Sequence, residues 1–183
     1  MEIRLASPVQ PDSIVDGEGI RTVLWTQGCT WHCFNCHNKE TWDPKGGFSL
    51  DVDIVLAKLL ASDQNITFSG GDPLFQSEAV AYLVEKLKKE NKNIWLYTGY
   101  TFEDLLKISK KDDNIREILE HIDVLVDGPF VNNLKSFNYT FRGSKNQRLI
   151  DVPSSLKQKK TVKITKYDDK PLRAREEGIK VYI

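Results

Sequence analysis

Apolar residues along the chain follow two spacings, one typical of buried strands and the other of amphipathic helices. Short apolar or β-branched runs, each followed by glycine, predict strands at residues 20–27, 65–69, 93–98 and 123–127. Apolar residues three and four positions apart predict helices at residues 51–61, 76–90 and 112–122. Thr101 and Asp104 fit a capping box that begins one more helix. The alternation predicts an α/β fold with parallel strands and crossover helices.

The loops that follow these strands are expected to lie together. In sheets of parallel strands the carboxyl ends meet at one edge, and ligands bind there. Each of these loops contains glycine, and they cover residues 28–36, 69–73, 98–100 and 127–130. Topology alone therefore predicts a functional edge, whether the sheet is open or closed.

The alternation weakens after residue 131. Residues 147–153, QRLIDVP, are compatible with a further strand. Residues 161–167, TVKITKY, alternate at period two and suit an edge hairpin with GIKVYI at residues 178–183. The lysines of this tail are expected to form a solvated face that guards the sheet edge.

Composition and charge add little to this picture. The chain has 183 residues, a length that suits one domain, and its 26 basic and 26 acidic residues balance. This balance indicates neither a nucleic-acid partner nor an anionic membrane. The N-terminal sequence MEIRLASPVQPDS lacks the apolar core of a signal peptide, and no apolar run approaches a membrane span. We expect one domain, residues 1–183, located in the cytoplasm.

The three cysteines lie in GCTWHCFNCHN, residues 28–38, as Cys29, Cys33 and Cys36. In a reducing compartment, cysteines this close together indicate metal or redox chemistry rather than disulfides. A structural zinc ion needs four ligands, and His32 or His37 can supply the fourth. Cysteine thiolates also hold [4Fe–4S] clusters, usually four of them. Three thiolates would leave one iron open to a small molecule, which can make a catalyst of an electron carrier.

The cysteine motif and several further blocks of the sequence resemble a known family. C-x3-C-x2-C after a strand is the signature of radical S-adenosylmethionine (SAM) enzymes, and further blocks resemble the activating proteins of glycyl-radical enzymes. The last two blocks are most similar to those of the activating proteins of anaerobic (class III) ribonucleotide reductase. The blocks keep family order within residues 3–152: DGEGIRTVLWTQGC, CHNKETWD, FSGGDPL, LYTGY, LVDGPF and FRGSKNQRLID.

The resemblance implies a partial (open) β/α barrel of the radical SAM type. It implies that Cys29, Cys33 and Cys36 hold a [4Fe–4S] cluster, with the amino and carboxylate groups of SAM on the fourth iron. It also implies that Asn35 and His37, which flank Cys36, lie against the adenine.

The resemblance further assigns Gly70, Gly71 and Asp72 to the SAM site, where they receive the methionine amine. The residue types support this assignment, because glycines let the backbone approach a ligand and Asp72 can accept from an ammonium. Without the cysteines, a plain strand-ending turn would be the preferred interpretation of the two glycines.

Other positions have two open interpretations. Asn38 resembles a family asparagine that organises the cluster loop, or it caps the turn that follows. Asp16 and Arg21 flank a glycine turn and suit a surface salt bridge as well as a functional role. Tyr97 and Asp127 end strands on the presumed active edge and either line the pocket or only form turns.

The activity that the resemblance implies is radical initiation. A reduced cluster passes one electron to SAM, and the resulting 5′-deoxyadenosyl radical removes a hydrogen atom from a glycine Cα of a large partner, the anaerobic ribonucleotide reductase. A flavodoxin- or ferredoxin-type protein is the expected electron donor, and neither a nucleic acid nor a membrane is expected as partner. The short chain predicts a barrel open on one side, which admits the glycine-bearing loop. Residues 153–183 form an extension without an assigned role.

Three alternatives stay open from the sequence. The partner can be another glycyl-radical enzyme of the pyruvate formate-lyase type. The protein can also be a small radical SAM enzyme that acts on a free metabolite, such as a deazapurine-forming enzyme. A different class altogether is a non-catalytic zinc module with a Cys3His ligand set.

Overall fold

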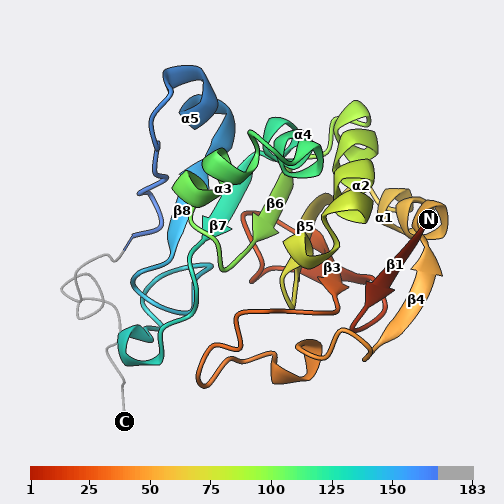
Figure 1. The fold of residues 1–183 in the computed structure, drawn as a ribbon, viewed down its shortest axis with the longest axis horizontal. Coiled ribbons are helices and arrows are strands. Elements are labelled where there is room, and N and C mark those ends of the chain that lie inside the picture. The colour runs from red at the N-terminus through yellow and green to blue at the C-terminus, as the bar shows by residue number, and fades with distance from the viewer. Residues whose placement is uncertain (169–183) are drawn as a thin grey trace, which may run out of the picture.

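The computed structural model describes residues 1–168 of the chain. Its centre is an eight-stranded sheet with the order β4-β1-β3-β5-β6-β7-β8, and β2 pairs with β3 beside this path (Figure 1). The strands are β1 (Glu2–Leu5), β2 (Gln10–Ser13), β3 (Arg21–Thr26), β4 (Phe48–Asp51), β5 (Asn65–Gly70), β6 (Ile94–Tyr97), β7 (Val124–Asp127) and β8 (Arg148–Asp151).

The four central strands are parallel, as the sequence predicts. β3, β5, β6 and β7 pair in parallel, with Thr26 opposite Gly70 and Tyr97 opposite Val126, so their carboxyl ends share one edge. The outer pairs β1–β3, β1–β4 and β7–β8 are antiparallel. Because β4 and β8 are the two ends of the strand order, the sheet does not close. The predicted open α/β architecture is confirmed.

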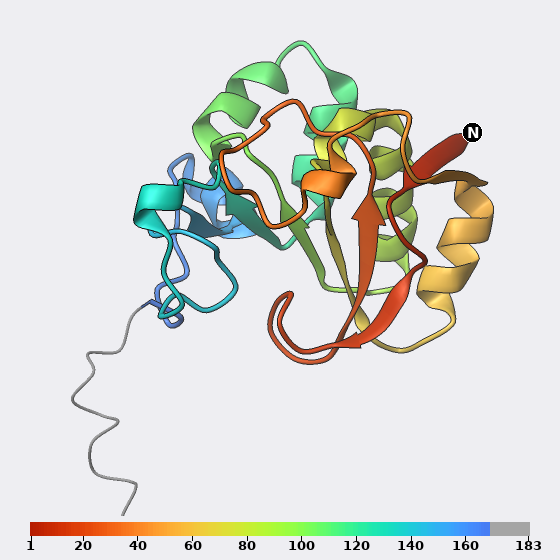
Figure 2. The same ribbon diagram turned by 90° about the horizontal axis from the view of Figure 1, so that it is seen from below.

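Helices cover one face of this sheet (Figures 1 and 2). They are α1 (Val52–Leu60), α2 (Ser77–Lys89), α3 (Phe102–Ile108), α4 (Asp113–His121) and α5 (Val152–Gln158). In α2, Leu83 and Leu87 are fully buried while lysines occupy its last turn, as expected of an amphipathic helix. The predicted N-cap of α3 at Thr101 is confirmed, because the amide N–H of Asp104 donates to Thr101 Oγ1 at 3.2 Å.

The other face of the sheet is covered by the chain's own loops. Trp95, Val124, Val126 and Leu149 are buried there. The side chains that pack against them come from segments outside the sheet and from one strand end: Tyr97, Phe141, Ile164 and Tyr167. This face leads directly to the carboxyl ends of the parallel strands, where Figure 2 shows the long loop between β3 and β4.

Several predictions about the chain's ends were incomplete. The N-terminal strands β1 and β2, the strand β4 and the helix α5 were not predicted, because their apolar patterns extend over too few residues. Residues 161–167 do not form the predicted hairpin strand; Lys163 makes one bridge to Ile150 of β8. The predicted partner strand at residues 178–183 lies outside the described residues.

Of the two interpretations of Asp16 and Arg21, the surface salt bridge was wrong, because Arg21 is not on the surface. Arg21 is fully buried, and its guanidinium donates to Thr67 Oγ1 at 2.7 Å and to Asn93 Oδ1 at 3.2 Å. It also lies 5.2 Å from the centroid of the Trp95 ring. Burial lowers the pKa of Arg21 to about 10, so it stays charged at neutral pH. Arg21 therefore joins β3, β5 and β6 at their amino ends.

Candidate metal centre and cofactor pocket

The cysteine loop begins directly after β3, at the carboxyl edge of the sheet (Figure 2). Cys29, Cys33 and Cys36 are all partly buried and none is in a disulfide. His32 and Asn35 have positive φ angles of 44° and 57°, and the N–H of Cys36 donates to the carbonyl of Cys33 at 3.0 Å. These local reversals coil the segment, so that three half-buried thiols lie on one short loop.

Backbone hydrogen bonds hold the base of this loop. The carbonyl of Gly28 accepts from the N–H of Asp72 at 2.9 Å, and the N–H of Gly28 donates to the carbonyl of Thr41 at 2.8 Å. The N–H of Gly71 donates to the carbonyl of Thr26 at 2.8 Å. The cysteine loop and the turn after β5 are therefore joined main chain to main chain.

Gly70 and Gly71 are required for this close approach. A Cβ on Gly71 would lie 2.3 Å from the carbonyl oxygen of Gly28. A Cβ on Gly70, whose φ is +108°, would lie 2.4 Å from the carbonyl oxygen of Thr26. The sequence predicts that these glycines let the backbone approach a ligand. In the structure, the backbone segments that lie close to Gly70 and Gly71 are those of β3 and of the cysteine loop. A contact between these glycines and a ligand stays a prediction.

Asp72 is almost completely buried, with 2% of its surface exposed. Its Oδ2 accepts from Trp31 Nε1 at 2.8 Å, from Thr98 Oγ1 at 2.9 Å and from the N–H of Gly99 at 3.0 Å. Its Oδ1 accepts from the N–H of Leu74 at 3.0 Å. Burial raises the pKa of Asp72, and the hydrogen bond from Gly99 opposes that shift most strongly.

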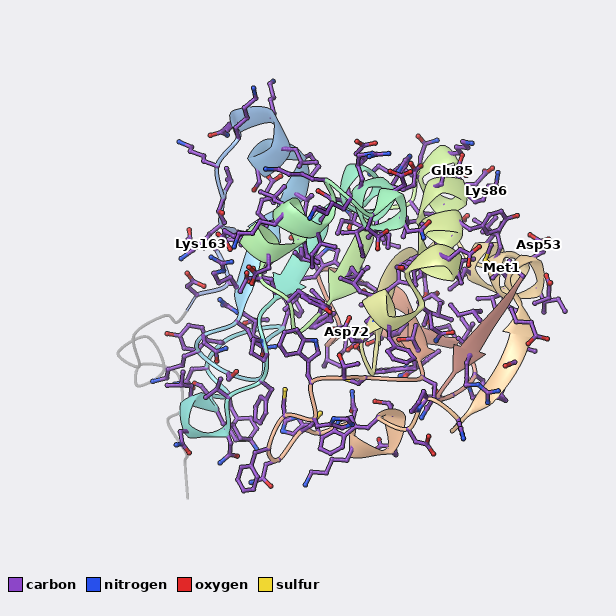
Figure 3. All side chains as sticks on the ribbon, in the orientation of Figure 1. Met1, Asp53, Asp72, Glu85, Lys86 and Lys163 are labelled. Carbon is purple, nitrogen blue, oxygen red and sulfur yellow. The ribbon has the colours of Figure 1, made fainter. Side chains whose placement is uncertain are left out.

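Four donors use most of the accepting capacity of one carboxylate. Asp72 therefore links the cysteine loop to the ends of β5 and β6, in the centre of the molecule where Figure 3 labels it. Its predicted role as receiver of a methionine amine stays a prediction, and the geometry adds a positioning role to it.

Trp31 is a hydrogen-bond partner of Asp72 that was not predicted from the sequence. It lies between the first two cysteines, and a Cβ on Gly99 would lie 2.5 Å from its ring. Its ring also meets that of Tyr100 edge to face, with centroids 4.9 Å apart. Together with the bond to Asp72, these contacts fasten the middle of the cysteine loop to the end of β6. A tryptophan inside the motif was the available signal, but its partner 41 residues away was not readable from sequence.

The side chain of Asn38 contacts the turn after β5 and makes no cap bond to the turn that follows it. Its Nδ2 donates to the carbonyl of Gly70 at 3.3 Å, and its N–H donates to Cys36 Sγ at 3.4 Å. Its carbonyl accepts from Thr41 Oγ1 at 2.7 Å, within the turn that follows. Asn38 thus organises the cysteine loop against the turn after β5.

A cavity of about 630 Å³ opens beside the cysteine loop. Residues 14–16 and the segment 135–143 contribute two of its walls. The rest of its lining comes from strand ends and from the cysteine loop: Trp25, Cys36, His37, Asn38, Ser69, Tyr97, Phe130 and Gln147. Its volume suits a ligand of cofactor size.

Only some of the site residues predicted from the sequence line this cavity. Cys36 and His37 line it, and the His37 ring lies 5.4 Å from that of Phe130. Asn35 does not line it; its exposed side chain donates to Asn132 Oδ1 at 3.3 Å. Gly70, Gly71 and Asp72 are also absent from the lining, although the neighbouring Ser69 is part of it. Of the other candidates, Tyr97 lines the cavity, whereas Asp127 is buried and forms an ion pair with Arg148.

The thiols are chemically suited to iron. Burial raises the pKa of the Cys29 and Cys33 thiols and so disfavours the thiolate in the absence of metal. The N–H of Asn38 donates to Cys36 Sγ at 3.4 Å. Such main-chain donors around sulfur are what a cluster site needs to stabilise bound thiolates.

A single zinc ion fits less well. Within residues 1–168, no three His, Cys, Asp or Glu side chains are close enough together to hold one ion. The ring of His32 packs edge to face against Trp42, with centroids 4.9 Å apart. A cubane cluster takes each thiolate on a different iron, so its ligands need not converge on one point. The separation of the three thiols is therefore no obstacle to a cluster.

Comparison with known proteins agrees with this chemistry. The family described as "4Fe-4S single cluster domain" matches residues 15–150. The protein thus falls in the class of single-cluster [4Fe–4S] proteins, which selects the cluster over the zinc module.

Curated relatives narrow the family. The anaerobic ribonucleoside-triphosphate reductase-activating protein of Enterobacteria phage T4 is 37% identical over 149 residues, which are 77% of this chain and 90% of that protein. The activating protein of Pasteurella multocida is 37% identical over 147 residues, which are 75% of this chain and 90% of that protein. The activating protein of Escherichia coli K12 is 35% identical over 147 residues, which are 75% of this chain and 92% of that protein. The chain belongs to the family of anaerobic ribonucleoside-triphosphate reductase-activating proteins.

Among solved structures, QueE from Escherichia coli aligns with 55% of this chain and 54% of its own. The TM-score of 0.43 and the identity of 16% are too low to define a common fold. In the described part of the chain, every helix is too short or too polar to span a bilayer.

Proposed function

We propose that the protein is a radical SAM activating enzyme that generates a glycyl radical on anaerobic ribonucleoside-triphosphate reductase. One observation carries the proposal: in a chain of this family, the motif that bears the three cysteines lines a cavity of about 630 Å³ at the carboxyl edge of a parallel sheet. That cavity adjoins Cys36 and offers room for SAM beside a cluster. When bound, the cluster and SAM supply the one-electron chemistry that makes an organic radical.

The chain's own residues hold and orient these groups. Cys29, Cys33 and Cys36 are the proposed cluster ligands. Trp31 and Asn38 fix the loop between and after them through their bonds to Asp72 and Gly70. A fixed loop would hold a bound cluster at a constant place beside the cavity, and proximity is the main contribution that these residues would make to catalysis.

For SAM itself we assign contacts to His37 and Ser69, which line the cavity. Asn35, Gly70, Gly71 and Asp72 remain candidates from the family pattern. For the last three, the contacts above support an additional role in which they join the cysteine loop to the sheet. The aromatic lining of the cavity includes Trp25 and Tyr97, which suits a purine and limits access of water.

The partner is assigned from the names of the relatives, which are activating proteins of the anaerobic reductase. Because the sheet does not close into a barrel, its open side suits a substrate that is a loop of a large protein. A flavodoxin- or ferredoxin-type protein as electron donor, the cytoplasm as location and a single domain over residues 1–183 complete the proposal.

The test begins with anaerobic reconstitution with iron and sulfide. A four-iron electron paramagnetic resonance signal that SAM perturbs, together with 5′-deoxyadenosine after reduction, is the expected result. Adding the anaerobic reductase, and in parallel pyruvate formate-lyase, is expected to give a glycyl-radical signal on the reductase only. A radical only on the lyase would change the partner, and a protein that binds one zinc ion and no cluster would end the radical mechanism.

A further inference from the structure

The segment 135–143 forms one wall of the cavity although it belongs to no long helix or strand. Within it, Phe141 has a positive φ of 63°, and its carbonyl accepts from Tyr97 Oη at 3.0 Å. The N–H of Gly143 donates to Gln147 Oε1 at 2.8 Å. These bonds hold the far end of the wall, residues 141–143, and a second segment contacts the same end.

This second segment is residues 161–168, which we call the strap. Arg142 Nη1 lies 2.8 Å from the Asp168 carboxylate, and Arg142 Nη2 donates to the carbonyl of Tyr167 at 3.0 Å. The rings of Phe141 and Tyr167 meet edge to face with centroids 5.0 Å apart. Two adjacent wall residues, Phe141 and Arg142, are therefore both held by the end of the strap.

The strap is itself attached at two places. Along β8, the N–H of Ile164 donates to the carbonyl of Leu149 at 2.8 Å, and the N–H of Asp151 donates to the carbonyl of Val162 at 2.9 Å. At its other end, Lys166 Nζ lies 2.8 Å from Glu18, close in sequence to the wall residues 14–16. The strap therefore runs along the sheet face opposite the helices from β8 to the wall 135–143, and it is tied to Glu18, two residues after the wall residues 14–16.

We propose that Tyr167 and Asp168 are positioning residues of the cofactor pocket, which act through Phe141 and Arg142 to fix the wall 135–143. The identity of the ligand rests on the proposed function; the placement of the wall does not. This gives a role to the part of the C-terminal extension that the structure describes.

The charge on Arg142 makes this dependence strong. Its side chain is 4% exposed, and Asp168 is its one carboxylate partner among residues 1–168. Removing that partner leaves a buried guanidinium without a counter-charge, and the wall must shift to hydrate it. Because the Asp168 side chain is 44% exposed, the protein as a whole can tolerate the change.

The test uses the full chain with Asp168→Asn and Tyr167→Ala, and Tyr167→Phe as the conservative variant. Asp113→Asn is the matched control, because it removes an exposed Asp–Arg pair on α4 with Arg116. Hydrogen exchange is expected to accelerate about tenfold in residues 137–143 for the first two variants. Tyr167→Phe and Asp113→Asn are expected to exchange like the wild type there, and α2 is expected to be unchanged in all four.

SAM affinity is then measured on the same variants after cluster loading. The dissociation constant is expected to rise about fivefold for Asp168→Asn and Tyr167→Ala, at unchanged iron content and unchanged unfolding midpoint. Unchanged exchange in residues 137–143, or faster exchange with unchanged SAM affinity, would overturn the positioning role. A wild type that holds a cluster but binds no SAM would instead refute the proposed function, and the exchange rates would still decide whether the strap holds the wall.

Discussion

Two loops border the same cavity and are held in place by different means. The cysteine loop is fastened from inside, by the buried carboxylate of Asp72 and by main-chain bonds to the turn after β5. The wall 135–143 is fastened from outside, by the strap and a partly exposed ion pair between Arg142 and Asp168. Buried, fully paired groups fix a geometry more firmly than exposed pairs. The comparison teaches that the cysteine loop is joined to the core of the sheet, whereas the wall 135–143 contacts the C-terminal segment, on which we propose that it depends.

The largest expected effect is on the cysteine loop itself. Cys33→Ala is expected to abolish SAM cleavage, because the cluster loses one of three thiolate ligands. Iron and sulfide content and 5′-deoxyadenosine formation are the measurements. Thr30→Ala, at an exposed position of the same loop, is the control and is expected to retain both. Normal cleavage at normal cluster content in Cys33→Ala would remove Cys33 from the ligand set.

Asp72→Ala tests whether this loop is fastened from inside. The substitution leaves four donors without their acceptor, including Trp31 Nε1 and Thr98 Oγ1, in a buried position. The free energy of unfolding is expected to fall by about 3 kcal/mol, measured by urea denaturation. Asp112→Ala removes a half-buried N-cap carboxylate of α4 and is expected to cost about 1 kcal/mol.

The same variant separates the two roles of Asp72. If it only received the methionine amine, the unfolding free energy would be unchanged and SAM affinity alone would fall. A positioning role predicts loss of stability together with weaker SAM binding, because the cysteine loop is released from β6.

Trp31→Phe is a finer test of the same attachment. The phenyl ring can keep the contact with Gly99, while the 2.8 Å bond from Nε1 to Asp72 is lost. We expect a loss of about 1 kcal/mol of unfolding free energy and faster hydrogen exchange in the cysteine loop. Trp42→Phe is the matched control, because Trp42 Nε1 is buried and has no partner among the described residues. Equal losses in both variants would argue against a special role for the Trp31–Asp72 bond.

The smallest expected effect concerns pH and the start of the strap. Glu103 forms an ion pair with Arg148 and accepts from Thr161 Oγ1 at 2.6 Å. The hydrogen bond from Arg148 is the main cause that lowers the pKa of Glu103 from 4.5 to about 2. Because the folded-state pKa is below the unfolded value, the stabilisation is present above pH 4.5 and is lost as the pH falls toward 2.

Glu103→Gln is therefore expected to weaken the acid dependence of stability between these two pH values. Since the Glu103 side chain is 46% exposed, solvent screening limits the effect to less than about 1 kcal/mol. Urea midpoints of both proteins at pH 7 and at pH 3 measure it. A difference between the two proteins that is the same at both pH values would contradict the assigned linkage.

The central fold was readable from the chain because its signals are local. The runs that predict β3, β5, β6 and β7 contain their own β-branched residues, and α1 and α2 carry their own apolar faces. The short strands β1, β2 and β4 carry too few residues for a period to stand out, and they are defined by pairing. The strand predicted at residues 161–167 is replaced by a single bridge from Lys163 to Ile150, because an edge segment takes whichever partner the sheet offers.

The sequence by itself determined the cysteine motif, the alternation of the four central strands with their helices, and the edge at which the loops meet. Each of these follows from neighbouring residues or from the chirality of crossover connections. Only the tertiary structure decided what the polar groups do. It turned Asp72 toward Trp31 and Thr98, buried Arg21 beneath Trp95, and brought Asp168 to Arg142. These pairings join residues far apart in sequence, and a buried polar group takes the partners that folding brings to it, because leaving it unpaired costs more than any local preference.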